Sequence, residues 1–179
     1  MFLNLEQHQY DTDIVPFIRN GIIIDTSVLD ILINGIVDSR IGNKQSLEFQ
    51  QILDFLDLMK VNNRWDKFFI TPHILTEVCN HFRNRYSKWD DYKKIVGEII
   101  PIIETMQENI VPKDKITQLI DFKNPVIEIG DMSIFVTTDD FINSGKRVAI
   151  LSNDRIMNSK YQDHKRVMIM DYQSVILNR

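Results

Sequence analysis

Two short aliphatic runs constrain the fold of this chain more than any other feature. Residues 22–24 are isoleucines followed directly by Asp25, and the run at residues 148–151 is followed within three positions by Asp154. A continuous apolar run between turn residues is typical of a strand buried on both faces, as in a parallel sheet covered by helices. Ligands bind outside the carboxyl ends of the strands in such a sheet. The two runs therefore predict an α/β fold with acidic side chains at its binding edge.

Apolar periodicity predicts further elements along the chain. Helical spacing predicts helices over residues 28–33, 47–60, 72 onward, 89–109, 113–122 and 131–143, and a short helix from residue 154. Short apolar runs predict further strands at residues 68–70 and 167–170. Strands that alternate with helices indicate an open, mainly parallel β-sheet with helices on both faces.

Turn and helix-breaking residues set the expected boundaries of these elements. Asn34 and Gly35 are expected to end the first helix, and the polar residues 38–46 to form a loop. Pro101 is expected to kink or break the helix that contains it. Gly145 is expected to end the helix before the second aliphatic run.

The composition fits one globular domain and argues against several classes of protein. The 179 residues are 44% hydrophobic and carry a net charge of −4, so no overall basic field attracts nucleic acid. Residues 1–20 are expected to be an irregular lead-in to a domain at residues 21–179. The start lacks the basic segment of a signal peptide, and no apolar run approaches the ~20 residues that cross a bilayer. We therefore expect a cytoplasmic protein without membrane contact. The lone Cys79 argues against a disulfide or a zinc finger and is expected to be buried.

Four acids are expected to meet at the carboxyl edge of the sheet: Asp25, Glu77, Asp131 and Asp154. At ~5 Å and an effective dielectric constant of about 20, each ionised pair would cost roughly 3 kcal/mol. A divalent cation removes that cost, and oxygen ligands suit Mg²⁺ or Mn²⁺ better than Zn²⁺. Such ions hold a phosphodiester and lower the pKa of a water molecule. Neighbouring polar residues are expected to orient the ligands: Thr26, Ser27, Ser152 and Asn153.

Each acid also has a purely structural interpretation. Asp25 could cap the turn after its strand, and Asp154 could cap a short helix. Glu77 could be a solvated helix residue. Asp131 competes for the same role with Glu128, three positions earlier, although its place at a helix start after a glycine favours it.

The helix that begins near Pro72 carries a polar stripe containing His73, Glu77 and His81. The histidines are too far apart along the helix to share one zinc ion, so we consider them as contacts to substrate, together with Arg85 and Arg155. A wider basic rim would comprise Arg83, Arg85, Lys88, Lys93 and Lys94. Trp65 and Trp89 could stack on bases or simply pack.

The four acidic stretches together resemble the PIN-domain nucleases. They are Ile22-Ile23-Ile24-Asp25-Thr26-Ser27, Ile70-Thr71-Pro72 with Glu77 on the next helix, Gly130-Asp131-Met132-Ser133-Ile134, and Ile150-Leu151-Ser152-Asn153-Asp154-Arg155. By this resemblance the four acids would be the metal-binding catalytic residues. It implies metal-dependent cleavage of single-stranded RNA, with DNA as a second substrate class. It also implies a toxin role, with an antitoxin partner and a homodimer. The chain differs from the compact toxin members in its lead-in and in a longer segment between Asp25 and Glu77.

Two other functions are kept open. In a haloacid-dehalogenase-like phosphatase Asp25 would be the nucleophile, and residues 150–153 resemble that family's second motif, but Ser27 stands where the phosphatases have a second aspartate. Alternatively, a non-catalytic PIN-like module would use the same fold to bind a protein partner.

Overall fold

The protein is described here by a computed structural model that covers residues 10–88, 90–120 and 127–173. The strands are β1 (Ile22–Ile24), β2 (Phe68–Ile70), β3 (Gln107–Glu108), β4 (Val148–Leu151) and β5 (Val167–Met170). The longer helices are α3 (Thr26–Arg40), α4 (Leu47–Leu58), α5 (Pro72–Tyr86), α6 (Tyr92–Thr105) and α8 (Ile129–Asn143). The shorter helical segments are η1 (Tyr10–Ile14), α2 (Val15–Ile18), η2 (Trp65–Lys67), α7 (Lys113–Leu119) and α9 (Arg155–Tyr161).

The five strands form a single sheet in the order β3-β2-β1-β4-β5, and every neighbouring pair is parallel. The chain builds outward from β1 to β3 and then crosses back to place β4 on the other side of β1. Ile24 pairs with Leu151, so β1 and β4 end at the same level of the sheet. The point where strand order reverses is where open α/β sheets bind their ligands. This point lies at the carboxyl ends of β1 and β4.

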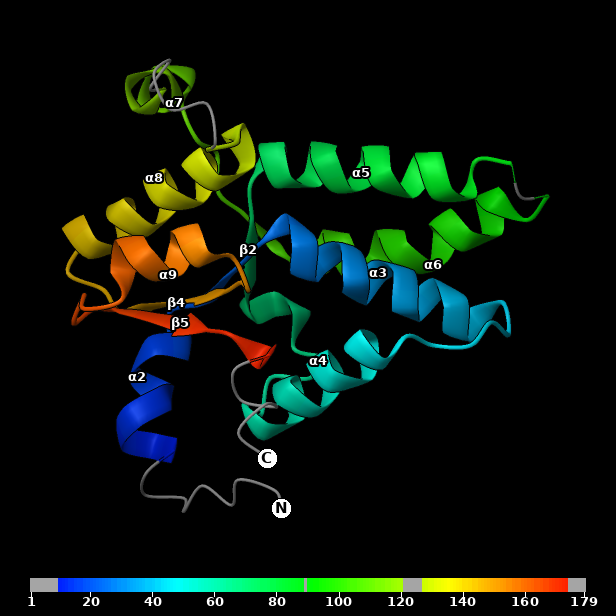
Figure 1. Cartoon of the computed structure of the whole chain (residues 1–179), viewed down its shortest axis with the longest axis horizontal. Helices are drawn as coiled ribbons and strands as arrows, with labels where there is room; N and C mark the ends of the chain where they lie inside the picture. Colours follow the sequence, from blue (N-terminus) through cyan, green and yellow to red (C-terminus); the bar gives the residue numbers. More distant parts are fainter. Residues whose placement is uncertain (1–9, 89, 121–126, 174–179) are drawn as a thin grey trace.

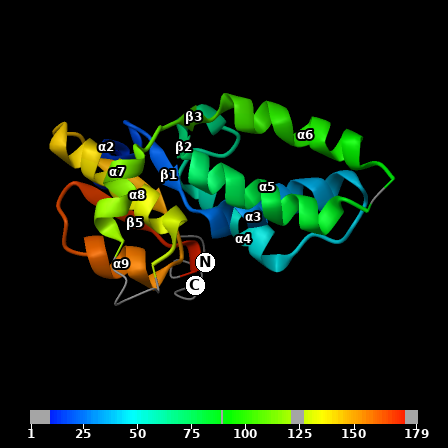
Figure 2. The same cartoon turned by 90° about the horizontal axis from the view of Figure 1, so that it is seen from above.

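Helices flank the sheet, as the alternating pattern predicted. In Figure 1, α8 and α9 lie over one face of β4 and β5, and α2 lies over the other. Figure 2 shows α3, α5 and α6 extending together beyond the sheet, away from α8 and α9. The predicted α/β class with a parallel sheet and flanking helices is therefore confirmed. In the described part of the chain, no helix is both long and apolar enough to span a bilayer.

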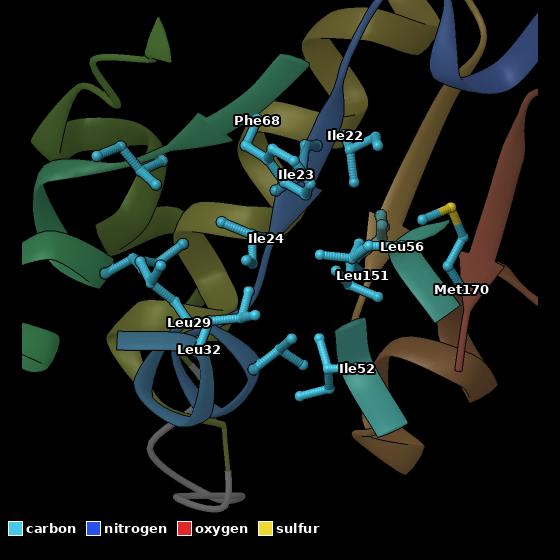
Figure 3. Packing of buried hydrophobic residues seen from close by; sticks show 14 of the residues in the cluster. Ile22, Ile23, Ile24, Leu29, Leu32, Ile52, Leu56, Phe68, Leu151 and Met170 are labelled. Atoms are coloured by element: carbon cyan, nitrogen blue, oxygen red, sulfur yellow. The ribbon is translucent and has the colours of Figure 1, made fainter. Parts of the chain in front are cut away.

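The core forms around the two aliphatic strands. Every residue of β1 and β4 is fully buried. Figure 3 shows Leu29 and Leu32 of α3 beside β1, and Ile52 and Leu56 of α4 near Leu151. Burying each such side chain contributes about 1.5–3 kcal/mol, so these strands are strongly fixed in the sheet. Their carboxyl ends, which carry the candidate site, are held with them.

The end of α3 differs from the prediction. The helix was expected to end near Asn34 and Gly35 but continues to Arg40, so residues 38–40 are helical rather than part of a loop. A Cβ atom at Gly35 would lie 2.1 Å from Cγ of Phe49 on α4. The glycine therefore permits close packing of two helices, and it does not end the first one.

Other boundaries also differ. Residues 10–18 form helical turns, where an irregular lead-in was expected. The helix predicted from residue 89 begins at Tyr92 and continues through Pro101 without a break. The short strand β3 follows it and was not predicted. The helix predicted over 113–122 ends at Leu119. Residues 1–9, position 89 and residues 121–126 lie outside the described residues. Cys79 is exposed rather than buried, because it lies beside the apolar face of α5 and not on it.

Candidate functional site

A pocket of about 720 Å³ lies at the carboxyl ends of β1 and β4. Its wall is strongly acidic and includes Asp25, Asp30, Glu48, Glu77, Glu128, Asp131 and Asp154. Among the described residues that line it, His81 is the only basic side chain. The fold thus brings the four acids expected to meet into one cavity, although they come from segments as far apart in the sequence as residues 25 and 154.

Asp25 is the most deeply buried of these acids, with only 7% of its surface exposed. It occupies the N-cap position of α3, but its side chain makes no capping hydrogen bond. Instead its Oδ2 atom accepts hydrogen bonds from Ser152 at 2.8 Å and from Ser27 at 3.1 Å. Burial raises the pKa of Asp25, the hydroxyl donors oppose that rise, and the charge of Asp154 adds to it. Neutral donors therefore hold the carboxylate in place, and none of them supplies a positive charge.

Glu77 approaches the same site from α5. Its Oε2 atom accepts a hydrogen bond from the Thr26 hydroxyl at 3.0 Å. Gly130, in the first turn of α8, leaves room for this contact, since a Cβ atom there would lie 3.0 Å from Oε2 of Glu77. The glycine before Asp131 therefore lets α8 and α5 meet at the pocket.

Asp131 lies in the first turn of α8, where it forms a capping box with Glu128. Its Oδ2 atom accepts from the backbone N–H of Glu128 at 3.3 Å. Burial, followed by the negative charge of Asp25, raises the pKa of Asp131 to about 6, and Asp154 and Glu128 contribute in the same direction. The capping and site interpretations both apply to this residue, and Glu128, its competitor in the sequence, lines the same pocket.

Asp154 also combines a structural contact with a place in the pocket. It caps α9, with Oδ1 accepting from the Ile156 N–H at 2.7 Å. The hydroxyl of Ser152 accepts from the Asp154 N–H at 3.0 Å and donates to Asp25. Ser152 therefore links the acid after β1 to the segment after β4.

Three of the four polar residues expected to orient the acids contact one of them. Thr26, Ser27 and Ser152 each donate to an acid of the site. Asn153 lines the pocket, and its buried Oδ1 has no hydrogen-bond partner among the described residues. Buried polar atoms without partners are uncommon in folded proteins.

The four expected substrate contacts divide into two groups. His81 lines the pocket and its Nδ1 contacts Oδ2 of Asp30 on α3. His73, Arg85 and Arg155 are not among the lining residues. Arg85 instead forms an ion pair with Asp38 at 3.0 Å, farther along α3 and α5. The wider rim, which runs from the end of α5 through the connecting turn to the start of α6, is exposed. Trp65 packs against Phe68 with ring centroids 5.7 Å apart.

The donor set suits a hard divalent cation, but the side chains do not by themselves complete a coordination shell. Within the described ranges, no group of three His, Cys, Asp or Glu side chains is placed to hold a metal ion. Glu77, Asp131 and Asp154 each have one oxygen engaged by a local donor. A carboxylate has two oxygens, so each acid retains a second one for a ligand.

Some lining residues were not singled out from the sequence. Asp30 lies one helical turn after Thr26 on α3, so its direction toward α5 followed from helical spacing once Thr26 was placed. Glu48, from α4, and Tyr172, after β5, enter the pocket through contacts between distant segments, for which the sequence carries no local signal.

Comparison of the chain with protein-family models, with curated proteins and with solved structures found no match.

Proposed function

We propose that the protein is a metal-dependent endonuclease that cleaves phosphodiester bonds in single-stranded RNA, with Mg²⁺ or Mn²⁺ as its cofactor. The observation that carries this proposal is the environment of Asp25. The residue is 7% exposed, and no Lys, Arg or His is paired with its carboxylate in the part of the chain that the structure describes. A buried acid at the ligand-binding edge of a parallel sheet, surrounded by further acids, favours the binding of a cation.

Electrostatics supports a divalent ion over simple protonation. The raised pKa values of Asp25 and Asp131 come partly from neighbouring carboxylates. The carboxylates repel one another when they are charged, and a doubly positive ion offsets that repulsion. Asp25, Glu77, Asp131 and Asp154 would hold it, although the present side-chain positions do not form a complete site.

A cation bound there would supply positive charge to a substrate phosphate and would make a water molecule more acidic. The chain's own residues supply the rest of the chemistry. Ser27 and Ser152 fix the carboxylate of Asp25, and Thr26 fixes that of Glu77. One carboxylate of the cluster would accept the proton of the attacking water.

The choice of single-stranded RNA rests on the resemblance of the four acidic stretches to PIN-domain nucleases. The PIN-like fold, the toxin role, an antitoxin partner and a homodimer are further proposals on the same basis. DNA is the alternative substrate class, and a cleavage assay with both nucleic acids separates the two.

The direct test is a cleavage assay with labelled single-stranded RNA and DNA in the presence and absence of Mn²⁺ or Mg²⁺. We expect cleavage only with the metal, and its loss in Asp154→Asn. Asparagine retains an oxygen to accept from the Ile156 N–H, so this variant removes the charge while keeping the helix cap. Asp140→Asn, at the far end of α8 from Asp131, is the matched control and should cleave normally.

Calorimetric titration with Mg²⁺ or Mn²⁺ gives a second measurement. The wild-type protein should bind the ion, and Asp154→Asn should bind it more weakly. A protein that binds no divalent ion and cuts neither nucleic acid would contradict the proposal. Hydrolysis of a small phosphate ester through an aspartyl-phosphate would indicate the phosphatase instead, and a captured protein partner without turnover would indicate a binding module.

A further inference from the structure

Helices α3 and α5 are joined by polar contacts that lead away from the acidic pocket. Thr26 contacts Glu77 at 3.0 Å, Asp30 contacts His81, and Asp38 contacts Arg85 at 3.0 Å. Residue numbers increase in both helices from one contact to the next. Figures 1 and 2 show the two helices side by side from the sheet outward. His81 is therefore the first basic group beyond the acids along this line of contacts.

The contact between His81 and Asp30 is not required to hold the helices together. The apolar face of α5, with Ile74, Val78 and Phe82, is buried in the core. The side chain of His81 is 50% exposed and that of Asp30 is 21% exposed. Ion pairs this accessible to solvent contribute little to stability. A role in packing alone therefore does not account for the pair.

The contact does fix the imidazole ring. Asp30 contacts Nδ1, so Nε2 is the ring nitrogen left to contact a ligand. The hydrogen bond to Asp30 raises the pKa of His81, and the charges of Asp30, Glu77 and Glu128 act in the same direction. These neighbours come from α3, from α5 itself and from the segment before α8. They favour the ring form in which both nitrogens donate.

We propose that His81, oriented by Asp30, contacts a phosphate of the bound nucleic acid through Nε2. The inference rests on the proposed nuclease function and adds to it a substrate-contacting residue and a positioning residue. A phosphate that enters a pocket lined by seven acids is repelled by them, and besides the proposed cation His81 is the only basic group among the described lining residues that can contact it. Asp30 lines the same pocket and holds the ring there through its contact with Nδ1.

The test separates binding from cleavage. Binding of a fluorescent single-stranded RNA is measured by anisotropy over a range of salt concentrations, in an Asp25→Asn background that prevents cutting. We expect His81→Gln to weaken binding about tenfold, as the loss of one charge-assisted hydrogen bond would. The slope of log affinity against log salt should also fall by about 0.7, the change expected for one phosphate contact on a single strand.

Two further variants distinguish a role in RNA binding from a purely structural role of the His81–Asp30 pair. Asp30→Asn should weaken binding less than His81→Gln, because the ring remains but is no longer held by a charged acceptor. His73→Gln is the matched control: it replaces a histidine two helical turns earlier that does not line the pocket, and it should leave affinity and salt slope unchanged. Thermal unfolding should be similar for all three, since both partners of the pair are accessible to solvent.

The outcomes distinguish the two proposals. If His81→Gln binds RNA as tightly as its parent with the same salt slope, the inference is wrong, whether or not the wild-type protein cleaves. If His81→Gln weakens binding but the wild-type protein cleaves nothing with either metal, the phosphate contact stands and the nuclease proposal fails. If the parent protein binds no oligonucleotide, the inference is wrong as well.

Discussion

The two ends of α3 carry aspartates that are almost equally buried but differently compensated. Asp25 at the start is 7% exposed, and Asp38 in the last turn is 8% exposed. Asp38 accepts from Arg85 at 3.0 Å, from Asn43 at 3.2 Å and from Tyr86 at 3.4 Å. Asp25 accepts from the hydroxyls of Ser27 and Ser152 and from the backbone of Thr26, all of them neutral donors, and it lies beside further acids. Asp38 is thus a buried acid paired with a cation of the chain, whereas Asp25 is a buried acid without such a partner among the described residues.

Burial alone does not distinguish the two aspartates, but the groups that contact them do. A buried carboxylate costs free energy unless it is paired or coordinates a metal. For Asp38 the pairing is complete within the protein, so its role is structural. For Asp25 no cation of the described residues supplies a positive charge, which is why we propose that a metal ion binds there. The contrast distinguishes the candidate site from the other buried acid without any comparison to known proteins.

The largest effect is expected when each aspartate is replaced by asparagine. Asp25→Asn should lower cleavage at least about a hundredfold, because it removes a ligand of the proposed cation. Its stability in metal-free buffer should be unchanged or higher, because a buried charge disappears. Asp38→Asn should cleave within about twofold of the wild type but lose about 1 kcal/mol of stability, because Arg85 loses its charged partner.

Urea unfolding in chelator and a cleavage assay in Mn²⁺ measure both quantities for each variant. The stability loss at Asp38 is kept small because the Arg85 side chain is 53% exposed and can be solvated by water. If Asp25→Asn is the destabilised variant and Asp38→Asn the inactive one, the assignment of roles along α3 is reversed and the proposed site is wrong.

A smaller effect on cleavage is expected when a neutral hydrogen-bond donor to one of the two aspartates is removed. Ser152→Ala removes the 2.8 Å hydrogen bond to Asp25 and the acceptor of the Asp154 N–H. Groups that orient metal ligands typically contribute 10–100-fold, so we expect activity to fall about tenfold. Asn43→Ala removes the corresponding donor of Asp38 and should leave activity unchanged. Steady-state cleavage rates check both, and equal losses in the two variants would remove the distinction between the donors.

The sequence predicted those parts of the fold that are determined locally. Residues 22–24 and 148–151 are recognisable as buried strands because every side chain in them is apolar. Their parallel pairing then places Asp25 and Asp154 at one edge. The helix expected to open at Gly130 and Asp131 begins one residue earlier, at Ile129, and only the structure shows that Gly130 makes room for Glu77.

Features that depend on contacts between distant segments were not predictable in this way. The reason for a glycine at position 35 is the Phe49 ring of another helix, which packs where a side chain would lie. The His81–Asp30 pair joins residues 51 positions apart. The strand β3 consists of two exposed polar residues, so it has no apolar pattern to reveal it.

The smallest effect is expected in the pH dependence of stability at Asp131. Its pKa rises from the model-peptide value of 3.8 to about 6 on folding. An acid whose pKa is raised by folding binds its proton more tightly in the folded state. Its contribution to stability is therefore present below about pH 4 and is lost as the pH rises to about 6.

Asp131→Asn keeps an acceptor for the Glu128 N–H and removes this dependence. The variant should thus become more stable than the wild type between about pH 4 and pH 6, by roughly 1 kcal/mol once solvent screening of the half-buried carboxylate is allowed for. Urea unfolding across this range measures the difference. Saturating Mg²⁺ should reverse its sign, because the ion stabilises only a site that retains its acids. Asp38 is already paired with Arg85, so Mg²⁺ should not alter the stability difference between Asp38→Asn and the wild type. If Mg²⁺ stabilises Asp131→Asn and the wild type equally, Asp131 is not a ligand of the proposed cation.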